Sequence, residues 1–187
     1  MKFAAAFMLA AVVTAPAFGA IQAAGTLSNK VVPGGYEYDL TLQNTGTTNI
    51  GSIWFAWIPG YDFLPSSPSA ITAPTGWTHN VIPPSFSGDG YSIQWIASAP
   101  LANGQSLPGF SFTTTEPPSI VNGASPIFFG IYQTRQTFAY IGGLELDPGT
   151  AFLPTVVVPE PASMSLLWAA AATLLLRRRK SADLAAN

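Results

Sequence analysis

Residues 36–44 read YEYDLTLQN, and along this stretch apolar and polar side chains alternate strictly. The apolar members of the series are Tyr36, Tyr38, Leu40 and Leu42, and a polar residue stands between each pair. Successive side chains of a β-strand point to opposite faces of the sheet, so this pattern puts one face in a core and the other in water. The stretch therefore predicts a β-strand of a sheet that is covered on one side.

Further strand-like stretches lie on both sides of this one and are separated by Pro, Gly, Ser and Asn. Residues 50–60, IGSIWFAWIPG, are apolar on both faces and predict a central strand or one covered on both sides. The remaining expected strands lie in residues 25–32, 90–98, 108–115, 125–134 and 151–158. Seven or so short strands without a periodic helix predict an all-β domain, an antiparallel β-sandwich. Residues 59–84 are expected to form a long proline-rich loop.

The pattern Y-x-Y-x-L-x-L-x-N-T-G over residues 36–46, followed by an aromatic strand, resembles immunoglobulin-like surface modules with an N-T-G hairpin. This resemblance implies an immunoglobulin-like sandwich and implies nothing about function.

The charge and cysteine content of the chain argue against several classes of function. Charged residues make up 9% of the 187 residues, against about 25% in typical soluble domains, whereas 48% hydrophobic residues favour a folded chain over a disordered one. Between Ala24 and Val158 the only bases are Lys30 and Arg135, against seven acids, which gives two minus seven, or −5. A chain segment without clustered bases is not expected to bind nucleic acid. The absence of cysteine excludes disulfides and thiolate chemistry.

The N-terminus reads MKFAAAFMLAAVVTAPAFGAIQAAG, which has the layout of a secretory signal peptide. Lys2 supplies the positive charge, residues 3–13 form an apolar run, and small residues follow. Cleavage is expected after Gly19 or after Ala23, and the sequence does not choose between them. Residues 1–23 are thus assigned as a signal helix for export by the Sec pathway.

The C-terminus contains an apolar run, residues 162–176, followed by four bases, Arg177, Arg178, Arg179 and Lys180. At about 1.5 Å per residue, this run of about 15 residues spans about 22 Å of a bilayer core about 30 Å thick. It therefore predicts a short transmembrane helix that is a weak permanent anchor. The bases would hold its end in the cytoplasm, with the β-domain outside.

The residues VPEPAS, the apolar segment and RRRK together resemble the PEP-CTERM sorting signal of Gram-negative bacteria. The resemblance implies that a membrane protease, exosortase, recognises Pro159, Glu160 and Pro161 and processes the tail nearby. Arg177 to Lys180 would act as the cytoplasmic stop signal, and the inner membrane would be a transient partner. Two prolines also fix an extended backbone there, which suits a protease cleft. The domain bounds expected are 24–155 for the sandwich, 156–180 for the sorting signal and 181–187 for a polar tail.

No catalytic mechanism can be assigned from the sequence. His79 is the sole histidine and no G-x-S-x-G elbow exists, so a hydrolytic triad has no support. Asp62 with Asp89, and Glu145 with Asp147, are carboxylate pairs outside any glycosidase motif. We expect no enzyme activity, no cofactor and no metal.

The resemblance implies a structural protein of the cell surface or extracellular matrix, associated with exopolysaccharide and biofilm. The alternative is a carbohydrate-binding module that retains polysaccharide by stacking sugar rings on exposed tryptophans. Its candidate residues are Trp54, Trp57, Trp77 and Trp95, although core packing is the more common role for such residues. Trp54 and Trp57, three residues apart, are expected on opposite faces of their strand.

Overall fold

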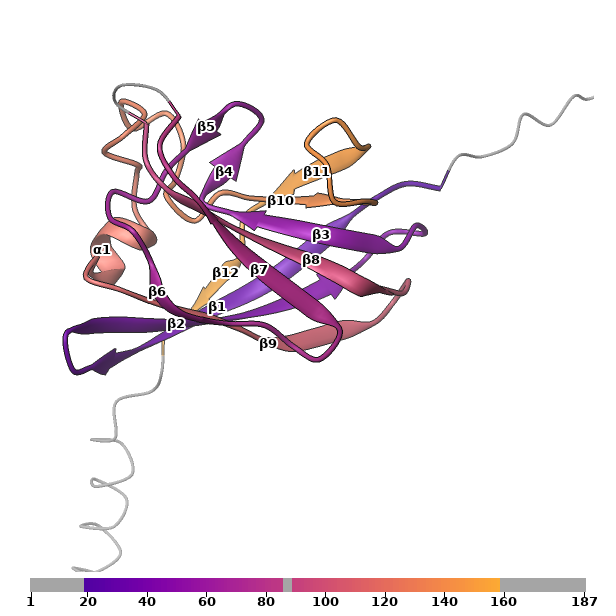
Figure 1. Cartoon of the computed structure of the whole chain (residues 1–187), viewed down its shortest axis with the longest axis horizontal. Helices are drawn as coiled ribbons and strands as arrows, with labels where there is room; N and C mark the ends of the chain where they lie inside the picture. Colours follow the sequence, from indigo (N-terminus) through magenta and orange to yellow (C-terminus); the bar gives the residue numbers. More distant parts are fainter. Residues whose placement is uncertain (1–18, 86–88, 159–187) are drawn as a thin grey trace, which may run out of the picture.

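The computed structural model describes residues 19–85 and 89–158, and most of them belong to two five-stranded sheets (Figure 1). Sheet A has the spatial order β12 (Thr155–Val157), β1 (Ala23–Val32), β2 (Gly35–Asn44), β9 (Ser106–Thr114) and β6 (Ser69–Thr72). Sheet B has the order β11 (Gly149–Phe152), β10 (Thr137–Tyr140), β3 (Ile50–Phe55), β8 (Ser92–Leu101) and β7 (Trp77–Ile82). A small ribbon joins β4 (Trp57–Ile58) to β5 (Tyr61–Asp62), and α1 spans Pro118–Val121. The all-β prediction is confirmed.

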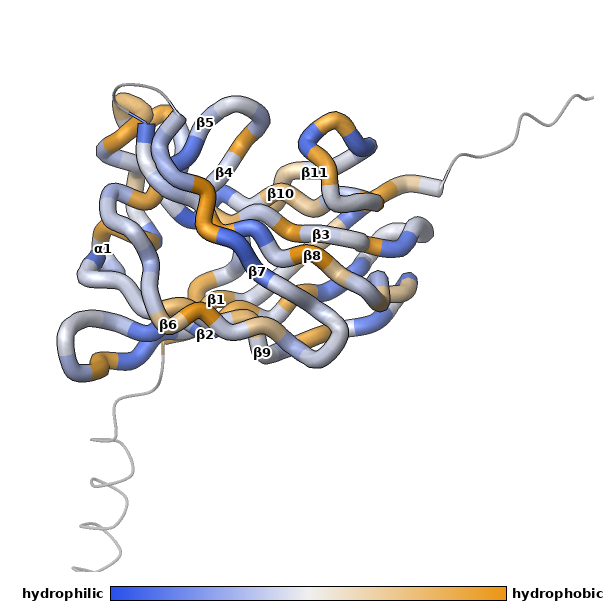
Figure 2. Tube along the Cα trace, in the orientation of Figure 1, coloured by the Kyte–Doolittle hydropathy of each residue, from blue (hydrophilic) through white to orange (hydrophobic). Residues whose placement is uncertain are grey.

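The stretch that defined the fold class forms β2, which pairs antiparallel with both β1 and β9. Tyr38, Leu40 and Leu42 are buried on its inner face, and its outer face carries the polar residues (Figure 2). β3 is the middle strand of sheet B, and all six of its residues are buried, as its two apolar faces predict. The neighbouring strands named above pair antiparallel, except β1 and β12, which are parallel.

The main core lies between the two sheets and is largely aromatic. Phe55 of sheet B packs on Phe112 of sheet A with ring centroids 5.0 Å apart, and Trp95 packs on Phe110 at 5.5 Å. Aromatic pairs at such separations add about 0.5–1.5 kcal/mol beyond the burial of their area. Because one core joins both inner faces, the domain is a β-sandwich.

Two expected segments differ from the prediction. Residues 125–134 form no strand but a series of turns with a single bridge, Ala124 to Gln133, and Phe129 and Gly130 both have positive φ. Periodicity alone does not establish a short apolar run as a strand, and Pro126 with Gly130 favours turns. Residues 59–84 are more ordered than expected, because they contain β5, β6 and the six-residue edge strand β7.

The strands extend slightly beyond the predicted limits of 24–155, from Ala23 to Val157. The two ends of the described chain lie at opposite ends of the sandwich (Figure 1). The expected signal helix, the tail helix and the basic cluster fall outside the described residues. Within residues 19–85 and 89–158, no helix is long and apolar enough to cross a membrane.

Candidate functional site

The C-terminal edge of sheet A leads directly into the predicted processing motif. β12 is the edge strand and pairs with β1 through Thr26 with Thr155, Leu27 with Val156 and Ser28 with Val157. Val157 is 46% exposed and Val158 is 75% exposed. Pro159, Glu160 and Pro161 follow at once, outside the described residues, as do Arg177, Arg178, Arg179 and Lys180. The ordered strand therefore ends two residues before the motif begins.

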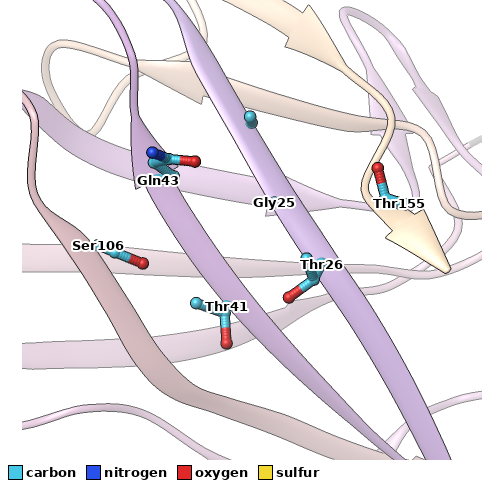
Figure 3. A pocket seen from close by; sticks show the side chains of 7 residues that line it. Gly25, Thr26, Thr41, Gln43, Ser106 and Thr155 are labelled. Atoms are coloured by element: carbon cyan, nitrogen blue, oxygen red, sulfur yellow. The ribbon is translucent and has the colours of Figure 1, made fainter. Parts of the chain in front are cut away.

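A shallow depression of about 220 Å³ lies on sheet A near the same edge (Figure 3). It crosses four strands, β12, β1, β2 and the start of β9. Its lining residues are Ala24, Gly25, Thr26, Thr41, Gln43, Ser106 and Thr155. Thr26 stands between Thr155 on one neighbouring strand and Thr41 on the other, which gives a row of three hydroxyls. The lining offers hydrogen bonds but no aromatic ring, and the sequence signalled it only as the polar face of the alternating strand.

The four tryptophans do not provide a stacking platform. Trp95 is fully buried, and Trp54, Trp57 and Trp77 are at most 8% exposed. Trp77 and Trp95 belong to the core between the sheets, and the Trp95 Nε1–H donates to the Thr72 carbonyl at 2.8 Å. Since none of the four presents an open ring face, their burial does not support the stacking hypothesis.

Trp54 and Trp57 were expected on opposite faces, and this expectation is wrong. Ala56 has a φ of +57°, which ends β3 and turns the chain before β4. The two indoles meet with ring centroids 4.4 Å apart and form a second cluster with Tyr140. The prediction assumed a flat strand through residues 54–57, and the left-handed backbone at Ala56 breaks that geometry. Such a conformation is uncommon outside glycine, so the spacing of the two tryptophans could not indicate it.

Of the two carboxylate pairs, the fold brings Asp62 and Asp89 together. The Asp89 Oδ1 accepts hydrogen bonds from the backbone N–H of Asp62 at 2.7 Å and of Gly90 at 3.0 Å. Burial raises the pKa of Asp62 to about 6, the Ser92 hydroxyl lowers it, and Asp89 and Glu145 raise it further. Asp62 is only 2% exposed and Asp89 is half-buried, so Asp62 itself has little access to a polysaccharide chain. The visible role of the pair is to hold the β4–β5 ribbon to the start of β8.

The other titratable candidates are separate from this pair. Glu145 is exposed, and the Asp147 Oδ2 accepts the Leu144 N–H at 2.8 Å, which closes a local turn. His79 is exposed on the edge strand β7. Over residues 19–85 and 89–158, no three His, Cys, Asp or Glu side chains gather in a way that would hold a metal ion.

Comparison with known proteins gives little beyond the fold. No family model matches the chain, and no curated protein matches it. An uncharacterised protein from Nocardia farcinica with an immunoglobulin-like fold is similar at a TM-score of 0.43 and 18% identity, covering 74% of this chain and 91% of that one. The unique CBM3 of Hungateiclostridium clariflavum is similar at a TM-score of 0.40 and 10% identity, covering 76% and 100%. At these scores the likenesses carry no argument about function.

Proposed function

We propose that this chain is an exported, non-enzymatic β-sandwich protein of the cell surface or extracellular matrix, immunoglobulin-like in type. In this proposal exosortase recognises Pro159, Glu160 and Pro161 and processes the tail after export. A matrix role beside exopolysaccharide is what the PEP-CTERM resemblance implies for such a protein.

One observation carries the proposal: every strand and every core residue of the described sandwich precedes the motif in the sequence. The last strand ends at Val157, and the last residue of the core is Phe152. Val158, the last described residue, is mostly exposed. Cleavage at or after Pro159 would thus leave every described strand and core contact intact.

The described surface also suits a structural role better than catalysis. Within the described residues the acid Asp62 is buried, and the one histidine, His79, lies on an exposed edge strand. These features support a protein whose function depends on its surface and stability. The pair Asp62 and Asp89 has a structural role, because it links the β4–β5 ribbon to the start of β8.

The test is mass spectrometry of the protein from the surface fraction of a Gram-negative host that contains exosortase. We expect a mature C-terminus near residues 159–161 and loss of this processing in the double variant Pro159→Ala/Pro161→Ala and in Glu160→Gln. Glu145→Gln is the matched control, because Glu145 is an exposed acid outside the motif. An intact tail reaching Asn187 in the surface fraction would refute the processing.

Carbohydrate binding remains the second candidate, and the observation that favours it is the hydroxyl- and amide-lined depression on sheet A. Such groups bind sugar hydroxyls, although the lining lacks a stacking ring. A glycan array that includes the host's own polysaccharide should show binding that Thr26→Val/Thr41→Val weakens at least tenfold. Absence of binding to every glycan would eliminate this candidate.

A further inference from the structure

The residues just before β1 are bound to the sandwich. The Ala20 carbonyl accepts the Thr47 N–H at 2.9 Å, and the Gln22 carbonyl accepts the N–H groups of Thr45 and Gly46, both at 3.1 Å. The Ala20 N–H in turn donates to the Thr47 Oγ1 at 2.9 Å. Ile21 is half-buried and packs against the main core. Residues 20–22 therefore continue the fold on the N-terminal side of β1.

The turn that holds them is formed by residues 44–48, and we call it the N-terminal cradle. Asn44 is fully buried and fixes the cradle: its Nδ2 donates to the carbonyls of Thr48 at 2.9 Å and Leu101 at 3.0 Å, and its Oδ1 accepts the Gly46 N–H. Gly46 permits the close approach. A Cβ at that position would lie 2.3 Å from the Ala20 oxygen and 2.5 Å from the Gln22 nitrogen.

The N-T-G sequence that suggested a hairpin thus has a more specific use. Each of its residues contacts the segment 20–22 or shapes the turn that does. A buried asparagine with all three of these hydrogen bonds and a glycine against a neighbouring backbone form a specific docking place for that segment.

We propose that signal peptidase cleaves the bond between Gly19 and Ala20, and that the new N-terminus at Ala20 is held by the N-terminal cradle. This inference rests on the proposed export. In the step, water adds across the amide, which leaves a carboxylate on Gly19 and an α-amine on Ala20 that takes up a proton at neutral pH. The ammonium can still donate to the Thr47 hydroxyl. Small residues then stand at the cleaved position, Gly19, and two residues before it, Ala17, as the enzyme requires.

Cleavage after Ala23 would have the opposite consequence. It would remove the acceptors of three backbone N–H groups and the core contact of Ile21, and it would delete the first residue of β1. That site also has Ile21, a large residue, where a small one is preferred.

The experiment is N-terminal sequencing and intact-mass measurement of the full chain, expressed with its own signal in a Gram-negative host and purified from the exported fraction. The expected N-terminus is Ala20-Ile21-Gln22. A start at Ala24, Phe18 or any other position after residue 2 overturns this inference but leaves export standing. A chain that is never cleaved refutes the export proposal itself, so the two failures can be told apart.

Two matched variants sharpen the test. Ala17→Leu should make the precursor accumulate at least tenfold, whereas Ala23→Leu should leave the cleavage position unchanged. The reverse result overturns the inference.

Hydrogen exchange on the mature wild-type protein gives an independent measurement, because the amides of Thr45, Gly46 and Thr47 should exchange slowly while Ala20 and Gln22 are present. Unprotected amides at these three positions would contradict the docking.

Discussion

The outer faces of sheets A and B differ, although both sheets share one core. On sheet A the outer face is polar and open, with Lys30 bridged to Glu37 at 2.9 Å and a row of threonines four residues farther along the strands. On sheet B the outer face carries Trp54, Phe138 and Tyr140, and Trp57 from the β4–β5 ribbon packs against all three rings.

This difference concerns polar atoms as much as apolar area. In the core between the sheets, the Tyr38 hydroxyl donates to the Glu116 carbonyl at 2.9 Å, and the Trp95 Nε1 has its acceptor. In the outer cluster of sheet B, the Trp54 Nε1 and the Tyr140 Oη are buried without a partner. The inner core is therefore fully satisfied at these residues, whereas the outer cluster combines good packing with polar atoms that lost their hydration.

The largest expected effect comes from removing a tryptophan of the inner core. Trp95→Ala should lower the free energy of unfolding by about 3–5 kcal/mol, because it opens a cavity and leaves the Thr72 carbonyl unpaired. Trp54→Ala should cost less, since its Nε1 makes no hydrogen bond and its side chain lies at the outer face. Urea unfolding followed by tryptophan fluorescence and circular dichroism measures both, and equal losses would contradict the proposed ranking.

The sequence predicted sheet A better than sheet B for a physical reason. Strict alternation in residues 36–44 fixes which side of β2 is wet, and that face is indeed open. In residues 50–58 both faces are apolar, so the pattern shows burial but not what covers the outer side. The cover depends on Ala56, whose positive φ redirects Trp57. No local signal at an alanine predicts that conformation.

The candidate sites show the same limit. The processing motif and the tail are linear features, so sequence reasoning could name their residues. The depression on sheet A and the N-terminal cradle are made by strands far apart in the chain, and pairing register decides them. The contact between Asp62 and Asp89 likewise joins residues that are distant in the sequence, so the sequence alone could not predict it.

The cover of sheet B is expected to be sensitive to pH through Asp62. Its pKa of about 6 in the folded state exceeds the ordinary value of 3.8, because burial disfavours the charged carboxylate. The folded state thus binds the proton more tightly than the unfolded state. The contribution of Asp62 to the free energy of unfolding should be fully present below pH 4 and should be lost, by about 3 kcal/mol, as the pH rises through 6.

Asp62→Asn isolates this contribution from the other carboxylates. The neutral side chain removes the titration beside Asp89 and Glu145, so the difference in stability between variant and wild type should grow from pH 4 to pH 7 in favour of the variant. Thermal unfolding at a series of pH values measures it. A difference that stays constant over this range would contradict the raised pKa.

A matched pair of tyrosines compares the two clusters directly. Tyr38→Phe should cost about 1 kcal/mol, because the Glu116 carbonyl loses its donor. Tyr140→Phe should be neutral or slightly stabilising, because it removes a buried hydroxyl that has no partner. Denaturant unfolding of both variants checks this, and a loss at Tyr140 as large as that at Tyr38 would show that its hydroxyl is satisfied, for example by water.

The smallest expected effect lies on the open face of sheet A, where Thr41→Val should change stability by less than about 0.5 kcal/mol. Thr41 is partly exposed on a strand, valine has a similar shape and strand preference, and no buried hydrogen bond is lost. Thr137→Val in sheet B is the contrast. Thr137 is fully buried and its Oγ1 donates to the Arg135 carbonyl at 2.9 Å, so the same substitution should cost about 1 kcal/mol. Because the chemical change is identical, unfolding measurements on the two variants report only the difference in surroundings. Equal effects would mean that the open face of sheet A is covered in solution, for instance by a bound polymer or a second chain.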